Sequence, residues 1–114
     1  FVQDRLDILY PQKSGPRTYS HNEALKQQIQ SLDKDGVKIK RFFTENELKH
    51  VYHDAINAAK SYQEVGITDC LVEYDNGDRI CIEITTSNYT QKIINGKCNF
   101  ADLISAEIIL HKAF

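Results

Sequence analysis

The chain has 114 residues, of which 41% are hydrophobic and 26% are charged, and its formal net charge is −2. This composition is typical of one soluble globular domain with a core around a small sheet. It excludes a membrane-spanning helix, because no apolar run approaches roughly 18 residues, but it does not exclude nucleic acid as a partner. Because the chain starts at Phe1, we expect it to be part of a longer protein.

The first 19 residues contain Pro11, Pro16 and Gly15 and show no sustained hydrophobic period, which predicts a linker or loose arm. Residues 20–114 then form a single domain. Ser20 and Glu23 have the spacing of a capping box, so we predict that a helix of about three turns begins there and ends before residue 36.

Residues 37–43 alternate and are rich in β-branched and aromatic side chains, which predicts a strand. Thr44 and Glu47 form a second capping box and open a predicted helix. A hairpin follows at about residues 67–89, and a helical segment lies beyond Asn95-Gly96. The apolar stripe predicted for the second helix is Leu48, Val51, Tyr52, Ala55, Ile56, Ala59 and Tyr62, and that of the last segment is Phe100, Leu103, Ile104 and Ile108.

This order of elements predicts an α/β or α+β fold, with a small mixed sheet and a central hairpin flanked by helices.

The length of the hairpin loop decides which side chains share a face. A two-residue loop at residues 76 and 77 would set two aspartates opposite each other and mix apolar with polar side chains. A three-residue loop closed by Gly77 in the left-handed region instead places Asp69 directly opposite Glu83. The second register is favoured because it gathers one apolar face, made of Cys70, Val72, Tyr74, Ile80, Ile82 and Ile84.

Two carboxylates on neighbouring strands have Cβ atoms about 5 Å apart, so Asp69 and Glu83 repel each other unless something neutralises them. Mg²⁺ or another divalent cation held between them would do so. The alternative is a solvated face, on which Asp69 simply starts a strand.

An Asp that begins a strand, a short hairpin and a Glu in an apolar strand resemble the core of the PD-(D/E)xK nuclease superfamily, over about residues 66–89. The resemblance implies that Asp69 and Glu83 bind a metal and that Glu23, in the first helix, assists. Thr85 stands where the family has a Lys. Lys92, on the turn after the strand, could reach back to take the role of that Lys, or Thr85 could donate a hydrogen bond to the phosphate.

His21 lies beside Glu23 and could act as a general acid if that helix end faces the hairpin, or it could be an exposed cap residue. Lys38, Lys40 and Arg41 suit phosphate contacts and equally the protection of an edge strand.

Four further side chains lie one turn apart on the second helix, as metal ligands would, but a solvated polar face is the favoured interpretation. They are Glu47, His50, His53 and Asp54.

We therefore expect a nuclease that hydrolyses phosphodiester bonds. It is similar to toxin domains of contact-dependent growth inhibition proteins, which implies delivery from an exported parent, action in the cytoplasm and a dedicated immunity protein. RNA such as transfer RNA is favoured over DNA because the basic cluster is small. Tyr19, Phe42 and Tyr89 are available for stacking on bases if they are exposed. A partner protein that carries the RNA could supply further affinity. The alternatives are a non-catalytic binding module and an immunity protein.

Overall fold

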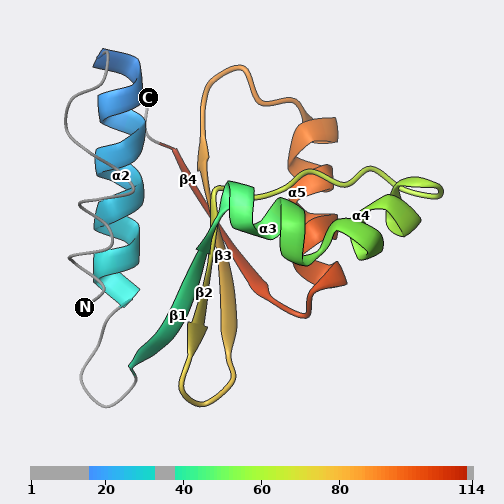
Figure 1. Ribbon diagram of the computed structural model, residues 1–114. Helices are drawn as coiled ribbons and strands as arrows, with labels where there is room; N and C mark the ends of the chain where they lie inside the picture. The colour runs from blue at the N-terminus through green and yellow to red at the C-terminus, as the bar shows by residue number, and fades with distance from the viewer. Residues whose placement is uncertain (1–15, 33–37, 113–114) are drawn as a thin grey trace.

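The computed structural model of the protein describes residues 16–32 and 38–112. It is a mixed α+β domain in which a four-stranded sheet carries helices on both faces (Figure 1). The elements are α2 (Pro16–Leu32), β1 (Ile39–Thr44), α3 (Glu45–Val51), α4 (His53–Lys60), β2 (Cys70–Tyr74), β3 (Arg79–Thr85), α5 (Gln91–Leu103) and β4 (Glu107–Lys112). The predicted fold class is confirmed.

The strands lie in the order β1-β2-β3-β4. Two antiparallel pairings, β1 with β2 and β2 with β3, are followed by a parallel pairing of β3 with β4. The parallel pair requires a crossover, which α5 supplies. The β2–β3 hairpin is therefore central in the sheet, as predicted.

The hairpin has the predicted register. Glu73 pairs with Arg79, the backbone N–H of Gly77 donates to the Tyr74 carbonyl over 3.0 Å, and Gly77 has a φ of +91°. Residues 75–77 thus form the three-residue loop, which only a residue tolerant of positive φ closes without strain.

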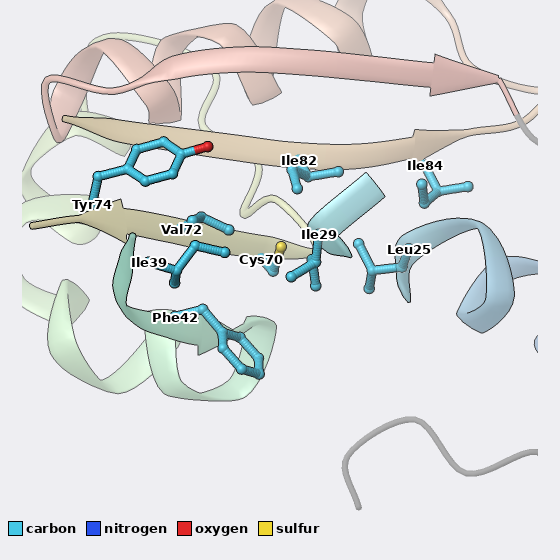
Figure 2. Close-up of a cluster of buried hydrophobic side chains, with 9 residues drawn as sticks. All are labelled: Leu25, Ile29, Ile39, Phe42, Cys70, Val72, Tyr74, Ile82 and Ile84. Atoms are coloured by element: carbon cyan, nitrogen blue, oxygen red, sulfur yellow. The ribbon is translucent and has the colours of Figure 1, made fainter. Parts of the chain in front are cut away.

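Each face of the sheet has its own core. On one face, α2 packs on the apolar side chains of the first three strands (Figure 2). On the other, α3, α4 and α5 cover a second cluster that includes Leu71 and Cys81. The alternative of a solvated second face is therefore wrong, because both faces are buried.

The first helix begins at Pro16, four residues earlier than expected, so residues 16–19 belong to α2 and not to the predicted arm. Proline suits the first helical position, since its φ is preset and the N–H that it lacks would have no helical partner there. Ser20 and Glu23 lie within the helix, and the predicted capping box does not start it. The predicted residues 1–15 of the arm lie outside the described part of the chain.

A β-bulge interrupts β1 between Ile39 and Arg41. The extra residue shifts the alternation, so Ile39 and Phe42 share the α2 face while Phe43 packs on the other side. Strict alternation would have grouped Ile39 with Phe43. Phe42 is buried, so the expectation that it is available for base stacking is wrong.

The predicted second helix is two short helices, α3 and α4, which meet at Tyr52. The capping box of Thr44 and Glu47 is confirmed at the start of α3. The predicted stripe is confirmed only in part: Leu48, Ile56 and Ala59 are buried and Tyr52 packs on the second core, but its other members are exposed. Val51 is 58% exposed and Tyr62 73% exposed, whereas Leu48 is fully buried.

The C-terminal segment differs most from the prediction. Asn95 and Gly96 lie within α5, which runs unbroken from Gln91 to Leu103. Ile108 belongs to the fourth strand and not to a helix. A short apolar run does not distinguish a buried strand from a buried helix by its period alone.

Leu48→Ala should lower the free energy of unfolding by about 2–5 kcal/mol, because it opens a cavity in the second core. Val51→Ala, on the same helix, should change it by less than about 0.5 kcal/mol, since that side chain is exposed. Urea unfolding followed by circular dichroism measures both. Equal losses for the two variants would contradict the described packing of α3.

Candidate active site

Asp69 and Glu83 face each other where β2 begins and β3 ends, one step beyond the pairing of Cys70 with Ile82. The backbone N–H of Asp69 donates to Glu83 Oε1 over 2.9 Å. In return, the backbone N–H of Ile84 donates to Asp69 Oδ2 over 2.8 Å. Each carboxylate is thus held by the backbone of the opposite strand, which fixes the distance between the two acids.

Glu83 is only 2% exposed, although it carries a carboxyl group. Its Oε2 lies 3.3 Å from Lys97 Nζ and also accepts a hydrogen bond from the Tyr89 hydroxyl. Burial raises the pKa of Glu83 and the nearby charge of Asp69 raises it further, while the contacts with Tyr89 and Lys97 oppose both effects. Glu83 therefore takes up a proton more readily than an exposed glutamate does.

Lys97 projects from α5, and its side chain is 17% exposed. Its ammonium donates to the Ile67 carbonyl over 2.6 Å in addition to its pairing with Glu83. These two contacts hold the cation against the strand end that carries both acids.

Two glycines allow α5 to come this close. The backbone N–H of Gly66 donates to the Gly96 carbonyl over 3.0 Å. A Cβ at Gly96 would lie 3.2 Å from the Gly66 nitrogen, and a Cβ at Gly66 would lie 3.3 Å from Lys97 Cδ. Larger residues would push the helix and its lysine away from the site.

His21 reaches the same acids from α2. Its Nε2 lies 3.2 Å from Asp69 Oδ2, and its side chain is half-buried. The hydrogen bond to Asp69 raises the pKa of His21 above its ordinary value, and burial opposes this rise in part. The expectation that this part of the helix faces the hairpin is confirmed, and the alternative of an exposed cap residue is wrong.

Tyr89 lies in the connection between β3 and α5. Burial raises the pKa of its phenol, as do the hydrogen bond to Glu83 and the charges of Asp69 and Glu45. The phenol therefore stays protonated and serves as a donor to Glu83.

Two of the other predicted site residues form ion pairs elsewhere, whereas Thr85 lies two residues beyond Glu83 on the same strand. Lys92 is 74% exposed and its Nζ lies 3.4 Å from Glu64, so it does not take the lysine position. Glu23 forms an ion pair with Lys26 at 3.7 Å. Thr85 is half-buried and is aligned with Lys112 of β4.

Within residues 16–32 and 38–112, no group of three or more His, Cys, Asp or Glu side chains is placed to hold a metal ion. Glu23 therefore does not complete a three-residue metal site with Asp69 and Glu83. The same holds for the polar face of α3 and α4, where His53 and Asp54 are exposed. The solvated-face interpretation holds for His50, His53 and Asp54, which are exposed, whereas Glu47 is half-buried in the capping box with Thr44.

One member of the predicted basic cluster at the start of β1, Arg41, already forms an ion pair within the fold. Lys38 and Lys40 are exposed beside the sheet edge, whereas Arg41 Nε donates to Glu73 over 2.7 Å. Arg79 donates to the same carboxylate over 3.1 Å. The hydrogen bond from Arg41 holds the pKa of Glu73 below its usual value, with Arg79 adding to the effect.

Sequence reasoning missed Lys97, although a signal was present. Lys97 lies three residues before Phe100 and four before Ala101, on the buried stripe of α5. A lysine on such a stripe needs a partner, because an unpaired buried cation is costly. Tyr89 carried no comparable signal, since its place depends on the path of a loop.

Comparisons with models of known protein families, with curated proteins and with solved structures found no match. None of the helices in the described part of the chain is long and apolar enough to cross a membrane.

Lys97→Met should raise the pKa of Glu83 further, because it removes the cation that opposes the effect of burial while keeping a side chain of similar length. Lys92→Met, on the same helix, should leave that pKa unchanged. Carboxyl ¹³C NMR titration of the two variants and the wild type measures this. A pKa of Glu83 that did not respond to Lys97→Met would contradict the ion pair.

Proposed function

We propose that the protein is a nuclease that hydrolyses phosphodiester bonds, with RNA as its preferred substrate, at the site formed by Asp69, Glu83 and Lys97. The observation that carries the proposal is the pair of interlocked carboxylates with the Lys97 ammonium 3.3 Å from Glu83. Acids and a lysine at one strand end match the residue types that the PD-(D/E)xK resemblance implies, with Lys97 in place of the predicted Lys92.

The donor set suits a hard divalent cation. Two adjacent carboxylates offer oxygen ligands, and Mg²⁺ in proteins is often held by one or two carboxylates, with phosphate and water completing its shell. Asp69 Oδ1 accepts no hydrogen bond from the described residues, so it is the oxygen best placed to be a ligand. When bound, the ion would polarise the phosphate and lower the pKa of the attacking water.

Lys97 supports the reaction through its remaining donor. An ammonium group has three N–H bonds, and Ile67 and Glu83 take two of them. The third can donate to a phosphate oxygen and stabilise the negative charge that develops there.

His21 is suited to the role of general acid. Its pKa is raised by Asp69, so it remains protonated closer to neutral pH than an ordinary histidine. It can then give a proton to the leaving oxygen while Asp69 holds the ring in place.

The charge distribution supports RNA over long duplex DNA. Gripping a duplex over many phosphates needs a broad basic face, but the net charge is −2 and Arg41 is bound to Glu73. RNA loops and ends are recognised with fewer phosphate contacts.

The resemblance to contact-dependent growth inhibition toxins supports a toxin domain of this kind. On this proposal, the domain is delivered from an exported parent, cuts RNA such as transfer RNA in the cytoplasm and is silenced by an immunity protein. A partner that carries the RNA would add to its affinity.

A non-catalytic binding module is the second candidate, because both oxygens of Glu83 are already occupied. Oε1 accepts from the Asp69 backbone, and Oε2 contacts Tyr89 and Lys97. On that alternative, the polar cluster only stabilises the fold, and the purified domain cuts no nucleic acid.

Glu83→Gln and Lys97→Met should each lower kcat/KM for RNA cleavage by about a hundredfold or more, because each removes charge at the reacting phosphate. Lys92→Met should leave cleavage unchanged. Total transfer RNA and plasmid DNA, incubated with each variant with and without EDTA and with added cell extract, give the readout. No cleavage by the wild type under any condition would favour the binding module, and wild-type rates for Glu83→Gln would overturn the assignment.

The pH dependence tests His21. A general acid works when protonated, so the rate should fall as pH rises through the pKa of His21, which lies above the ordinary value of 6.5. In His21→Asn this fall should disappear and the maximal rate should drop about a hundredfold. His50→Asn, an exposed control, should keep the wild-type profile. An unchanged profile in His21→Asn would exclude the role.

A further inference from the structure

A cavity of about 240 Å³ opens beside α3 and α4 and is here named the α3–α4 pocket. Its lining residues are Lys49, His53, Ile56, Asn57, Lys60 and Ile67. Two isoleucines, one of them buried, provide its apolar part, while two lysines, a histidine and an amide provide its polar part. None of these lining residues is acidic.

This combination suits one nucleobase with a neighbouring phosphate. The flat face of a base packs well on apolar side chains such as Ile56 and Ile67. His53 Nε2 and Asn57 Nδ2 contact each other over 3.2 Å, and His53 Nδ1 lies 3.3 Å from Asp54 Oδ1. The second N–H and the carbonyl oxygen of the Asn57 amide are the groups that can bind a base edge. Lysine ammonium groups bind phosphate, and the volume lies below the roughly 300 Å³ at which pockets for larger ligands begin.

Lys49 is able to turn toward such a phosphate. It forms an ion pair with Glu45 at 3.7 Å, but both side chains are about half exposed. Exposed pairs of this kind contribute little and break readily.

Ile67 connects the pocket with the candidate active site. It lines the pocket, and its carbonyl accepts the hydrogen bond from Lys97. The pocket therefore adjoins the chain segment that leads into Asp69, because Ile67 lies two residues before that acid.

We propose that the α3–α4 pocket is a substrate subsite that binds one base of the RNA together with an adjacent phosphate, next to the scissile bond. The inference rests on the proposed nuclease function, since it places the pocket along the path of the same substrate.

A larger cavity of about 400 Å³ at the hairpin tip provides an internal comparison. Its lining contains the acids Asp78 and Glu107, and Arg79 there is already bound to Glu73 and to the Ile104 carbonyl. It is therefore less suited to a phosphate, and nucleotides should not prefer it.

Binding is measured without any cleavage, by amide NMR titration of the wild-type protein with each of the four ribonucleoside 5′-monophosphates. These probes contain no phosphodiester bond. We expect saturable shifts at the residues of the α3–α4 pocket, and weaker or no saturation with inorganic phosphate. Lys49→Gln combined with Lys60→Gln should weaken nucleotide binding at least about tenfold, because each lysine contributes a phosphate contact.

Lys92→Gln combined with Lys112→Gln removes the same charge from exposed lysines elsewhere and should change the affinity less than about twofold. The proposal is overturned by the absence of saturation, by equal binding of phosphate alone, by shifts centred on Gly77 and Ser105 at the hairpin tip, or by unchanged affinity in the pocket variant. If nucleotides do not bind as expected, but the wild type cuts RNA and Glu83→Gln does not, only the subsite is rejected. Nucleotide binding in a protein that cuts no RNA would reject the nuclease function and the placement of the subsite beside a scissile bond, and would leave the pocket a nucleotide-binding site.

Discussion

The buried carboxylate of Glu83 is the group on which the arrangement of the site depends. An ionised carboxylate removed from water costs several kcal/mol unless it is paired and hydrogen-bonded. Its three partners come from separate parts of the chain: the backbone of Asp69 before β2, Tyr89 in the loop after β3, and Lys97 on α5. A single carboxylate therefore fixes a strand end, a loop and a helix relative to one another.

The central hairpin could be predicted from the sequence because its determinants are local. Loop length, a glycine tolerant of positive φ and a period of two set the register, and the register alone brings Asp69 opposite Glu83. The features that could not be predicted depend on distant contacts. Lys97 reaches the acids only because Gly66 and Gly96 let two remote segments touch, and β4 is a strand because β3 offers it an edge.

The predicted start of α2 and the predicted alternation of β1 were wrong for the same physical reason, which is competition between local signals. Pro16 and the Ser20–Glu23 spacing both predict a helix start, and the structure uses the earlier one. In β1 the bulge overrides alternation and places Ile39 and Phe42 in the same core cluster. Neither competition is decided by the sequence alone, because the outcome depends on tertiary packing.

The contact between Lys97 and Glu83 also bears on the order of folding. Hairpins close on a timescale of about 1–10 μs, whereas a crossover that sets a parallel strand in place requires more of the chain to be ordered. Until α5 docks, the strand ends bring two like charges together with no lysine to balance them, and this repulsion opposes tight pairing there at neutral pH. Two backbone hydrogen bonds within the hairpin oppose that repulsion. We therefore expect the open end of the hairpin to reach its full stability only when α5 docks, because Lys97 then balances the two acids.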